Sequence, residues 1–238
     1  HASKIIFGTA CVDGGVGGNL NHMFYGFGGG ELSAGRKRND RVGGGAGTNT
    51  VTFSDLSAGV DVNLSSGQAT GATAGTDTLT SIENVVGSAG TDSITGSDEA
   101  NRLSGGAGND TILGKGGDDE LIGGAGTDTV SYNGSTTDVS VNLVDGVATG
   151  TETGSDTLTG FENVIGGDGN DTLIGDSQAN RLEGGGGDDQ FVSAGGNDTI
   201  LGGGGIDSAS FETATTTVTV DLAAGTVTGT ETGQDTIS

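Results

Sequence analysis

The sequence predicts an all-β fold in which short coils stack into a solenoid. Residues 87–131 divide into five consecutive nine-residue rows, and every row begins with glycine and carries an apolar residue at its eighth position. The chain contains 52 glycines, no proline, no tryptophan and only 4% aromatic residues. This inventory cannot fill a wide globular core, but one aliphatic side chain per row can fill a narrow, repetitive one. No stretch shows a 3.6-residue apolar period, so we expect almost no helix.

Each row predicts a glycine turn followed by a short strand. The rows of 87–131 read GSAGTDSIT, GSDEANRLS, GGAGNDTIL, GKGGDDELI and GGAGTDTVS. Their first halves are rich in glycine, which tolerates positive φ and close backbone approach. Their second halves alternate polar and apolar residues, as half-buried strands do. The eighth positions, which we expect to form the core, hold Ile94, Leu103, Ile112, Leu121 and Val130.

A larger period of 79 residues contains these rows. The block that starts at Gly87 reappears at Gly166, and a degraded version starts at Gly8. We predict three repeats: 1–86 (degenerate, with rows at 8–52 and linking coils at 53–86), 87–165 (rows 87–131, linking coils 132–165) and a truncated 166–238 (rows 166–210, linking coils 211–238). The regular spacing favours a segment of a long tandem array.

The linking segments carry strand signals of their own. Val139, Val141 and Leu143 alternate with polar residues and predict a longer strand. Residues 156–158 read Asp-Thr-Leu and resemble another row. We therefore expect the linking segments to form further coils of the same stack, with wider loops.

The charge balance restricts the partners. The chain has 32 acidic residues against 8 basic ones, a formal net charge of −24. Nucleic acids and anionic membrane surfaces attract basic patches, so we expect neither as a partner and no membrane insertion. Cys11 is the single cysteine, which excludes an internal disulfide. No arrangement of residues suggests catalysis, and we expect no enzyme activity from this chain.

The sixth position of the rows is acidic or amidic in a way that composition alone does not produce. Parallel coils stack about 4.8 Å apart, and carboxylates at that spacing repel one another unless something neutralises them. Calcium accepts about six to eight oxygen ligands and mixes carboxylates with backbone carbonyls. The row supplies both oxygen types, because glycine turns expose carbonyl groups. The pattern therefore indicates several calcium ions.

The row G-G-x-G-x-D-x-U-x resembles the calcium-binding nonapeptide repeats of RTX (hemolysin-type) secreted proteins. The resemblance implies a right-handed parallel β-roll, or β-helix solenoid, with two rows per turn and calcium in the glycine-rich turns between rows n and n+2. On this chain it implies one edge with Asp92, Asp110 and Asp128 and a matching edge in the next repeat with Asp171, Asp189 and Asp207. The other edges hold Asn101 with Asp119 and Asn180 with Asp198, where the neutral amides imply weaker sites.

Two alternatives stay open for these residues. A sixth-position aspartate can also cap a turn without metal. This is the favoured interpretation for the first block, whose sixth positions hold Asp13, His22, Glu31, Asp40 and Asn49. The basic stretch Arg36–Arg38 lies where an acidic site would be expected. Asp98, Asp118, Asp168 and Asp188 lie in turns, and we expect them to be solvated or accessory.

The resemblance leaves two functions. The first is a calcium-binding structural module of a large secreted or cell-surface protein, such as an adhesin stalk, a surface layer or an extracellular filament. It would stay unfolded for type I secretion, fold outside the cell and continue into further repeats or associate with itself. The alternative is an accessory module of an exported enzyme, such as a protease, lipase or polysaccharide epimerase, which would aid secretion, folding or glycan binding.

Overall fold

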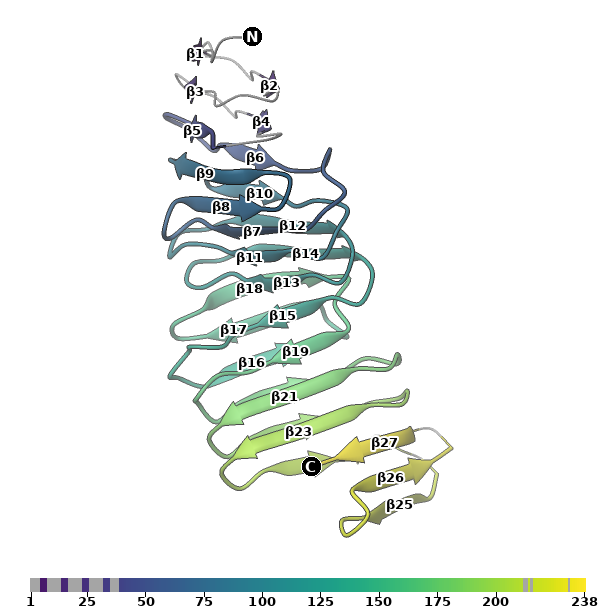
Figure 1. The fold of residues 1–238 in the computed structure, drawn as a ribbon. Helices are drawn as coiled ribbons and strands as arrows, with labels where there is room; N and C mark the ends of the chain where they lie inside the picture. The colour runs from purple at the N-terminus through teal and green to yellow at the C-terminus, as the bar shows by residue number, and fades with distance from the viewer. Residues whose placement is uncertain are drawn as a thin grey trace. The chain divides into compact units, whose positions relative to one another are not determined.

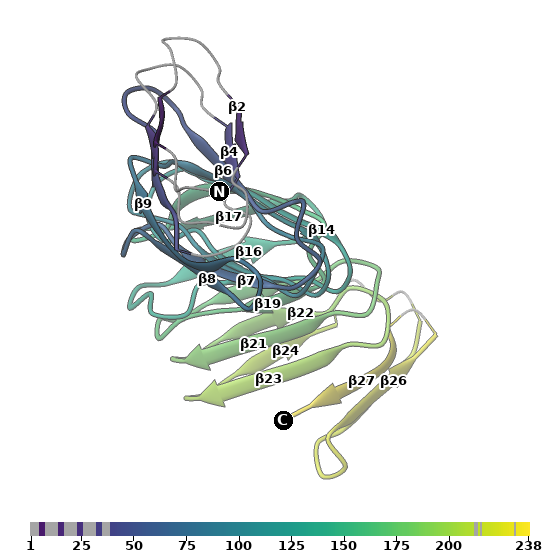
Figure 2. The same ribbon diagram turned by 45° about the horizontal axis from the view of Figure 1, so that its top comes forward.

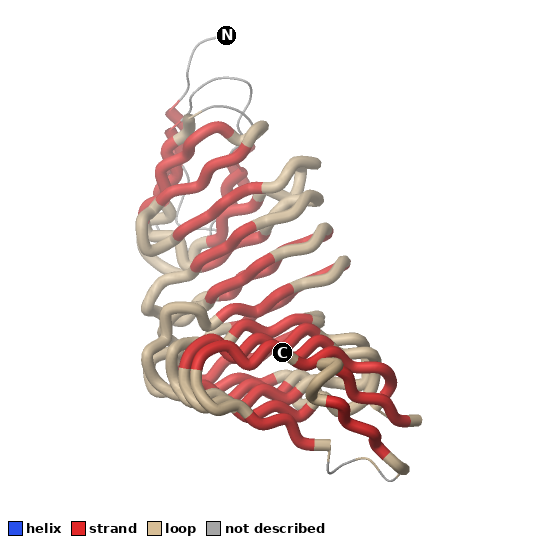
Figure 3. Tube along the Cα trace, turned by 60° about the horizontal axis from the view of Figure 1, so that its bottom comes forward, coloured by secondary structure: helices blue, strands red, loops and turns tan. Residues whose placement is uncertain are grey.

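The computed structural model describes residues 5–7, 14–16, 23–25, 32–34, 39–211, 214, 216–230 and 232–238. In this part of the chain every regular element is a β-strand and no helix occurs (Figures 1 and 3). The chain divides into two compact units, His1–Asp128 and Thr129–Ser238, which we describe separately. The expected all-β solenoid is confirmed. Asp13, His22, Glu31 and the basic stretch 36–38 lie outside the described residues.

The first unit builds two sheets from short strands. One sheet has the order β1-β3-β5-β9-β8-β7-β11-β13 and the other the order β2-β4-β6-β10-β12-β14. The strands are β1 Ile5–Phe7, β2 Gly14–Val16, β3 Met23–Tyr25, β4 Leu32–Ala34, β5 Arg41–Gly43, β6 Thr50–Thr52, β7 Val60–Asn63, β8 Gln68–Gly71, β9 Gly75–Thr80, β10 Asn84–Val86, β11 Ser93–Thr95, β12 Arg102–Ala107, β13 Thr111–Leu113 and β14 Glu120–Ala125.

The second unit repeats this plan. Its sheets have the orders β15-β19-β21-β23-β27-β26-β25 and β18-β17-β16-β20-β22-β24. The strands are β15 Thr129–Ser131, β16 Val139–Asn142, β17 Val147–Gly150, β18 Gly154–Thr159, β19 Asn163–Ile165, β20 Thr172–Ile174, β21 Arg181–Gly186, β22 Gln190–Val192, β23 Thr199–Gly204, β24 Ser208–Ser210, β25 Val218–Asp221, β26 Thr226–Gly229 and β27 Gly233–Ile237.

Each row pairs with the row after next, so two rows make one turn. Ile94 of β11 lies opposite Ile112 of β13, and Leu103 of β12 lies opposite Leu121 of β14, in parallel register. In the second unit Leu173 of β20 pairs in the same way with Phe191 of β22. Successive rows therefore alternate between the two sheets, as the stacked ribbons of Figure 2 show. This alternation is the β-roll arrangement that the resemblance to RTX repeats implies.

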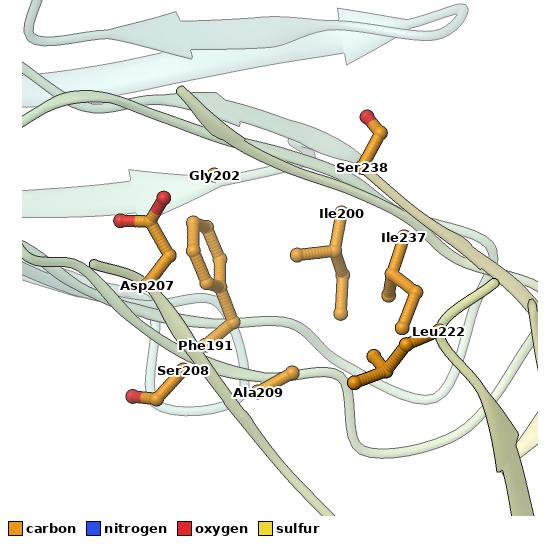
Figure 4. A pocket seen from close by; sticks show the side chains of 9 residues that line it. All are labelled: Phe191, Ile200, Gly202, Asp207, Ser208, Ala209, Leu222, Ile237 and Ser238. Atoms are coloured by element: carbon orange, nitrogen blue, oxygen red, sulfur yellow. The ribbon is translucent and has the colours of Figure 1, made fainter. Parts of the chain in front are cut away.

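The eighth-position side chains form the core between the sheets. In the two intact blocks they are almost fully buried, with one exception in the last row. The buried members are Ile94, Leu103, Ile112, Leu121, Val130, Leu173, Leu182, Phe191 and Ile200. The exception is Ala209, which is small and exposed. Beside it Phe191, Ile200, Leu222 and Ile237 line a cavity of about 330 Å³ (Figure 4).

The linking segments differ from the expected parallel coils in their middle. β7, β8 and β9 form an antiparallel meander, with Val62 opposite Ala69 and Ala69 opposite Asp77. The first hairpin closes at Gly67, whose φ of 66° suits glycine, and the side-chain oxygen of Asn63 accepts a 2.8 Å hydrogen bond from Ser66 N. Only the outer strands of the meander, β9 and β7, run parallel to the neighbouring coils.

The second linking segment has the same meander, formed by β16, β17 and β18. The strand expected at Val139, Val141 and Leu143 is present as β16, and it ends at Asn142. Leu143 N still donates a 2.9 Å hydrogen bond to Ile174 O beyond the end of the strand. None of the described residues forms a helix that is long and apolar enough to cross a membrane.

Candidate metal centre

The sixth-position aspartates stack along one edge of each unit. In the first unit Asp92 N donates to Oδ1 of Asp110, and Asp110 N donates to Oδ1 of Asp128, both at 2.8 Å. Because rows n and n+2 pair in register, each aspartate at the end of a glycine turn lies directly over the next. The sequence therefore places Asp92, Asp110 and Asp128 correctly on one edge.

The second unit contains the matching stack. Asp171 N donates to Oδ1 of Asp189 at 2.8 Å, and Asp189 N donates to Oδ1 of Asp207 at 3.0 Å. Asp171 and Asp189 are buried, whereas Asp207 in the last row is exposed. The same backbone-to-carboxylate contact thus recurs at every level of the stack.

The amide-containing edges use this contact too. Asn101 N donates to Oδ1 of Asp119 at 2.8 Å, and Asn180 N donates to Oδ1 of Asp198 at 2.9 Å. All ten residues that the sequence assigns to metal therefore occupy stacked positions at the ends of glycine turns. These residues differ in the hydrogen bonds made by the remaining polar atoms of their side chains.

Among the ten assigned residues, three aspartates keep a second oxygen for which the described residues provide no hydrogen-bond donor. Oδ2 of Asp110, Asp189 and Asp198 is buried and accepts no hydrogen bond from the described residues. In Asp110 and Asp189 it points at the first glycine of its own row: a Cβ added to Gly105 would lie 2.2 Å from Asp110 Oδ2, and one on Gly184 would lie 2.0 Å from Asp189 Oδ2. The glycine at the first position therefore leaves the space in which this oxygen lies.

The first aspartate of each block is satisfied by its own turn. Asp92 Oδ2 accepts from Ser88 N at 2.5 Å, and Asp171 Oδ2 accepts from Gly167 N at 2.6 Å. The corresponding N–H groups belong to Gly106 and Gly185 in the rows of Asp110 and Asp189. These glycines adopt φ of 109° and 111° and donate no such bond within the described structure. The orientation of one peptide group thus decides whether Oδ2 has a donor.

The asparagines are also satisfied by their surroundings. Asn101 Oδ1 accepts from Ser97 N at 2.7 Å, and its Nδ2 donates to Glu83 O at 2.8 Å. Asn180 makes the equivalent contacts with Asp176 N at 2.7 Å and with Glu162 O at 3.0 Å. A neutral amide completes its hydrogen bonds here without a cation.

Burial makes the stacked carboxylates hard to ionise without a positive partner. Loss of hydration raises the pKa of Asp110 and Asp189 to about 6 and that of Asp198 to about 7, and the hydrogen bonds from backbone N–H groups oppose this only in part. Burial likewise raises the pKa of Asp171. Neighbouring carboxylates raise the pKa further. A hard cation with oxygen ligands fits this chemistry.

Comparison with known proteins agrees with the geometry. The RTX calcium-binding nonapeptide repeat (four copies) matches overlapping windows that span residues 77–130 and 156–209. Both stretches are RTX repeats. RTX nonapeptide repeats bind calcium at several sites, so calcium is the metal that this part of the chain binds. Such repeats are structural modules.

One solved structure is distantly similar to the chain. It is the extracellular lipase LipA from Serratia marcescens, with 15% identity and a TM-score of 0.31. The match covers 100% of this chain and 38% of the lipase chain, so this chain spans well under half of that protein. Comparison with curated proteins gave no match.

The RTX stacks extend beyond the residues that the sequence assigns to metal. Asp40 N donates to Oδ1 of Asp77 at 2.8 Å, and Asp198 N donates to Oδ1 of Asp235 at 3.0 Å. Glu83 also joins a stack, since its Oε2 accepts from Asn49 N at 2.7 Å. The signals were the Asp-Thr-Leu motif of the linking segment and the nine-residue frame continued one row before Gly87, which places Glu83 at a sixth position.

The carboxylates of the stacks fit calcium only together with carbonyl oxygens of the backbone. Among the described residues no three acidic, histidine or cysteine side chains converge on one point. Each RTX level therefore offers stacked carboxylates in pairs, and carbonyl oxygens of the glycine turns must supply the remaining ligands that calcium prefers. Asp110, Asp189 and Asp198, with their unused oxygens, are the residues best placed for this.

Proposed function

We propose that this chain is a calcium-stabilised structural module of a large secreted or cell-surface protein, such as an adhesin stalk, a surface layer or an extracellular filament. One observation carries the proposal. Buried carboxylates stack in register, and Oδ2 of Asp110 and Oδ2 of Asp189 accept no hydrogen bond from the described residues. A buried charge without a partner costs several kcal/mol, so the folded state needs a cation.

The mechanism that follows is folding coupled to ion binding. Without calcium, the conformational entropy of 52 glycines and the repulsion between stacked carboxylates oppose the fold. The stacked carboxylates and the carbonyl oxygens of the glycine turns would hold calcium, and its binding free energy would then become folding free energy. A chain of this kind stays unfolded where calcium is scarce and folds where it is plentiful. This behaviour suits type I secretion and an extracellular location.

All ten sixth-position residues remain candidates for this role, but the geometry does not favour them equally. We assign the principal ligand role to Asp110, Asp189 and Asp198. Asp92, Asp171, Asn101 and Asn180 are engaged by protein donors, and we assign them a supporting role. Asp119, Asp128 and Asp207 belong to the same stacks and complete the sites beside them.

The internal repeats also support continuation or self-association. Val62 and Val141 occupy the same position in β7 and β16 and are fully buried, because a following row pairs with each strand. Their equivalent Val220 in β25 is 48% exposed, and within the described residues β25 pairs only with β26. In both earlier repeats a G-x-D-x-U row covers this edge. We propose that such a row, from a further repeat or another copy, covers β25.

Calcium titration of the chain, followed by circular dichroism, tests the function. Strand signal should be weak in excess chelator and rise cooperatively with calcium, while magnesium should be much less effective because it demands stricter octahedral geometry. Equal strand content in chelator and in calcium would overturn the proposal.

The accessory-module alternative predicts the same calcium response and differs in its neighbours. A catalytic domain beside these repeats would favour the alternative, and further 79-residue repeats would favour the structural array. A glycan-binding role would appear as affinity for extracellular polysaccharide in the calcium-loaded state only.

A further inference from the structure

The linking segments carry an aspartate that completes the stack from outside the nonapeptide rows. Asp235 lies in β27, the third strand of a meander, and β27 runs parallel to β23 with Thr236 opposite Thr199. Asp198 N donates to Asp235 Oδ1 at 3.0 Å, which is the contact that elsewhere joins a row to the row after next. Asp235 therefore occupies a sixth position although its segment, TETGQDTIS, lacks the opening glycines.

Two carboxylate oxygens at this junction have no hydrogen-bond donor. Oδ2 of Asp198 and Oδ2 of Asp235 are buried, each in a side chain that is 2% exposed, and neither is hydrogen-bonded within the described part of the chain. The hydroxyl of Ser193 is also buried and lacks a partner there. Ser193 holds the first position of the Asp198 row, where other rows place the glycine beneath Oδ2. These three buried oxygens belong to the two coils that meet at this junction, the row of Asp198 and the segment of Asp235.

The glycine turns at this junction stack as they do between rows. A Cβ added to Gly233 would lie 1.7 Å from Gly196 O, and one added to Gly205 would lie 2.0 Å from Gly187 O. The turn of the meander therefore approaches the carbonyl side of the row as closely as one row approaches another. Carbonyl oxygens and carboxylates are arranged here as in the RTX levels.

In the middle repeat a hydroxyl group donates a hydrogen bond to the equivalent carboxylate. Asp156 is the equivalent of Asp235, and its Oδ2 accepts a 3.0 Å hydrogen bond from the buried Tyr132 hydroxyl. Phenylalanine replaces this tyrosine in the other repeats, as Phe53 and Phe211. Phe53 N and Tyr132 N make the same 2.8 Å backbone bond, to Val86 O and Ile165 O. Asp77, the equivalent in the first repeat, keeps a buried Oδ2 without a donor among the described residues.

We infer that Asp77 and Asp235 each bind a calcium ion at the junction of row stack and meander, and that Asp156 does not. Phe53 has no hydroxyl to donate to Asp77, and Phe211 holds the equivalent position in the repeat of Asp235. At neutral pH each of these buried carboxylates therefore needs a cation, whereas Tyr132 supplies a donor to Asp156. Hard divalent cations with oxygen ligands are the ligand class. The inference rests on the proposed calcium function and extends it from the sixth positions of the glycine rows to aspartates of the linking segments.

Native mass spectrometry of the full chain in calcium counts the ions directly. Phe53→Tyr should lose one ion per chain, because the new hydroxyl satisfies Asp77 without removing its carboxylate. Asp235→Asn should also lose one ion. Asp156→Asn is the matched control and should keep the wild-type number.

The outcomes separate this inference from the proposed function. A wild-type chain that binds no calcium would overturn both. A wild-type chain that binds calcium, with unchanged counts for Phe53→Tyr and Asp235→Asn, would overturn the inference alone. An ion lost from Asp156→Asn would also contradict it. Phe53→Tyr retains every carboxylate, so it remains informative if Asp235→Asn fails to fold.

Discussion

The aspartate edge and the asparagine edge of the first unit differ in one functional group at equivalent positions. Asp110 and Asn101 both end a glycine turn, and the backbone N–H of each donates to the aspartate of the row after next. Asn101 then satisfies itself through Ser97 N and Glu83 O, while Asp110 retains a buried oxygen without a donor in the described structure. Asn101 therefore completes its hydrogen bonds without metal, and Asp110 does not.

This contrast separates the stability of the stack from its dependence on calcium. A neutral side chain at the sixth position keeps the backbone contact and costs no buried charge. A carboxylate at that position makes the fold conditional on a cation. The alternation of the two types along the chain would allow part of each coil to hold its shape while the other part responds to calcium.

The largest expected effect comes from removing a principal ligand. Asp110→Ala should raise the calcium concentration at the folding midpoint by about tenfold or more, equivalent to roughly 1.4 kcal/mol or more of binding free energy. The matched control is Asp98→Ala, since Asp98 is exposed in a turn of the same unit. Circular dichroism during calcium titration measures both midpoints. Equal shifts would contradict the roles assigned to these two residues.

A glycine beneath the unused oxygen should be the next most sensitive position. Gly184→Ala would place a Cβ 2.0 Å from Asp189 Oδ2, so either the carboxylate or the backbone must move. Overpacking of this kind costs about 1–3 kcal/mol. Gly186→Ala, in the same strand, meets nothing closer than 3.6 Å and should be nearly neutral. Thermal unfolding in calcium compares the two, and equal melting temperatures would show that Oδ2 does not occupy this space.

Acidification should substitute in part for calcium. Burial raises the folded-state pKa of Asp110 to about 6 and those of Asp77 and Asp198 to about 7, from an ordinary value of 3.8. A raised pKa means that the protonated group favours the fold. The stabilisation is fully present below about pH 3.8 and is lost as the pH rises through 6 to 7.

The metal-free chain should therefore show more strand signal at pH 5 than at pH 7.5, as measured by circular dichroism in excess chelator. Saturating calcium should remove most of this difference, because the cation then neutralises the same carboxylates. A metal-free chain that gains strand structure as the pH rises would contradict the mechanism.

The rows could be predicted from sequence because their information is local. Glycine at the first position, an acid or amide at the sixth and an aliphatic at the eighth fix the turn, the strand and the buried face. The pairing of Ile94 with Ile112 then follows from the nine-residue period and two rows per turn. The stacking of all ten assigned residues follows from that register.

The meanders and the oxygen contacts could not be predicted in the same way. Val60 and Val62 alternate identically in a parallel coil and in an antiparallel hairpin, and only the turn at Gly67 decides between them. Asp92 and Asp110 look equivalent in the sequence. They differ because the Ser88 N–H reaches Oδ2, whereas Gly106 adopts a φ of 109°. The two turns also lie on different neighbours: Gly90 approaches the loop residues Ser57 and Ala58, whereas Gly108 approaches Gly90 of another row.

Replacing Asn101 of the asparagine edge by aspartate should change the calcium midpoint least. The direction of the change, in chelator and in calcium, tests whether this edge binds the ion. Asn101→Asp replaces a self-satisfied amide by a carboxylate beside Asp119. In excess chelator the variant should have less strand signal than wild type, because a second buried charge joins the stack. In calcium it should bind more tightly, by about two- to threefold in the folding midpoint, since carboxylate ligands raise affinity for this ion. Asn101→Ala is the control. It loses the hydrogen bonds of the amide and adds no charge, so it should show less strand signal than wild type both in chelator and in calcium. If Asn101→Asp loses the same strand signal with and without calcium, this edge does not bind the ion.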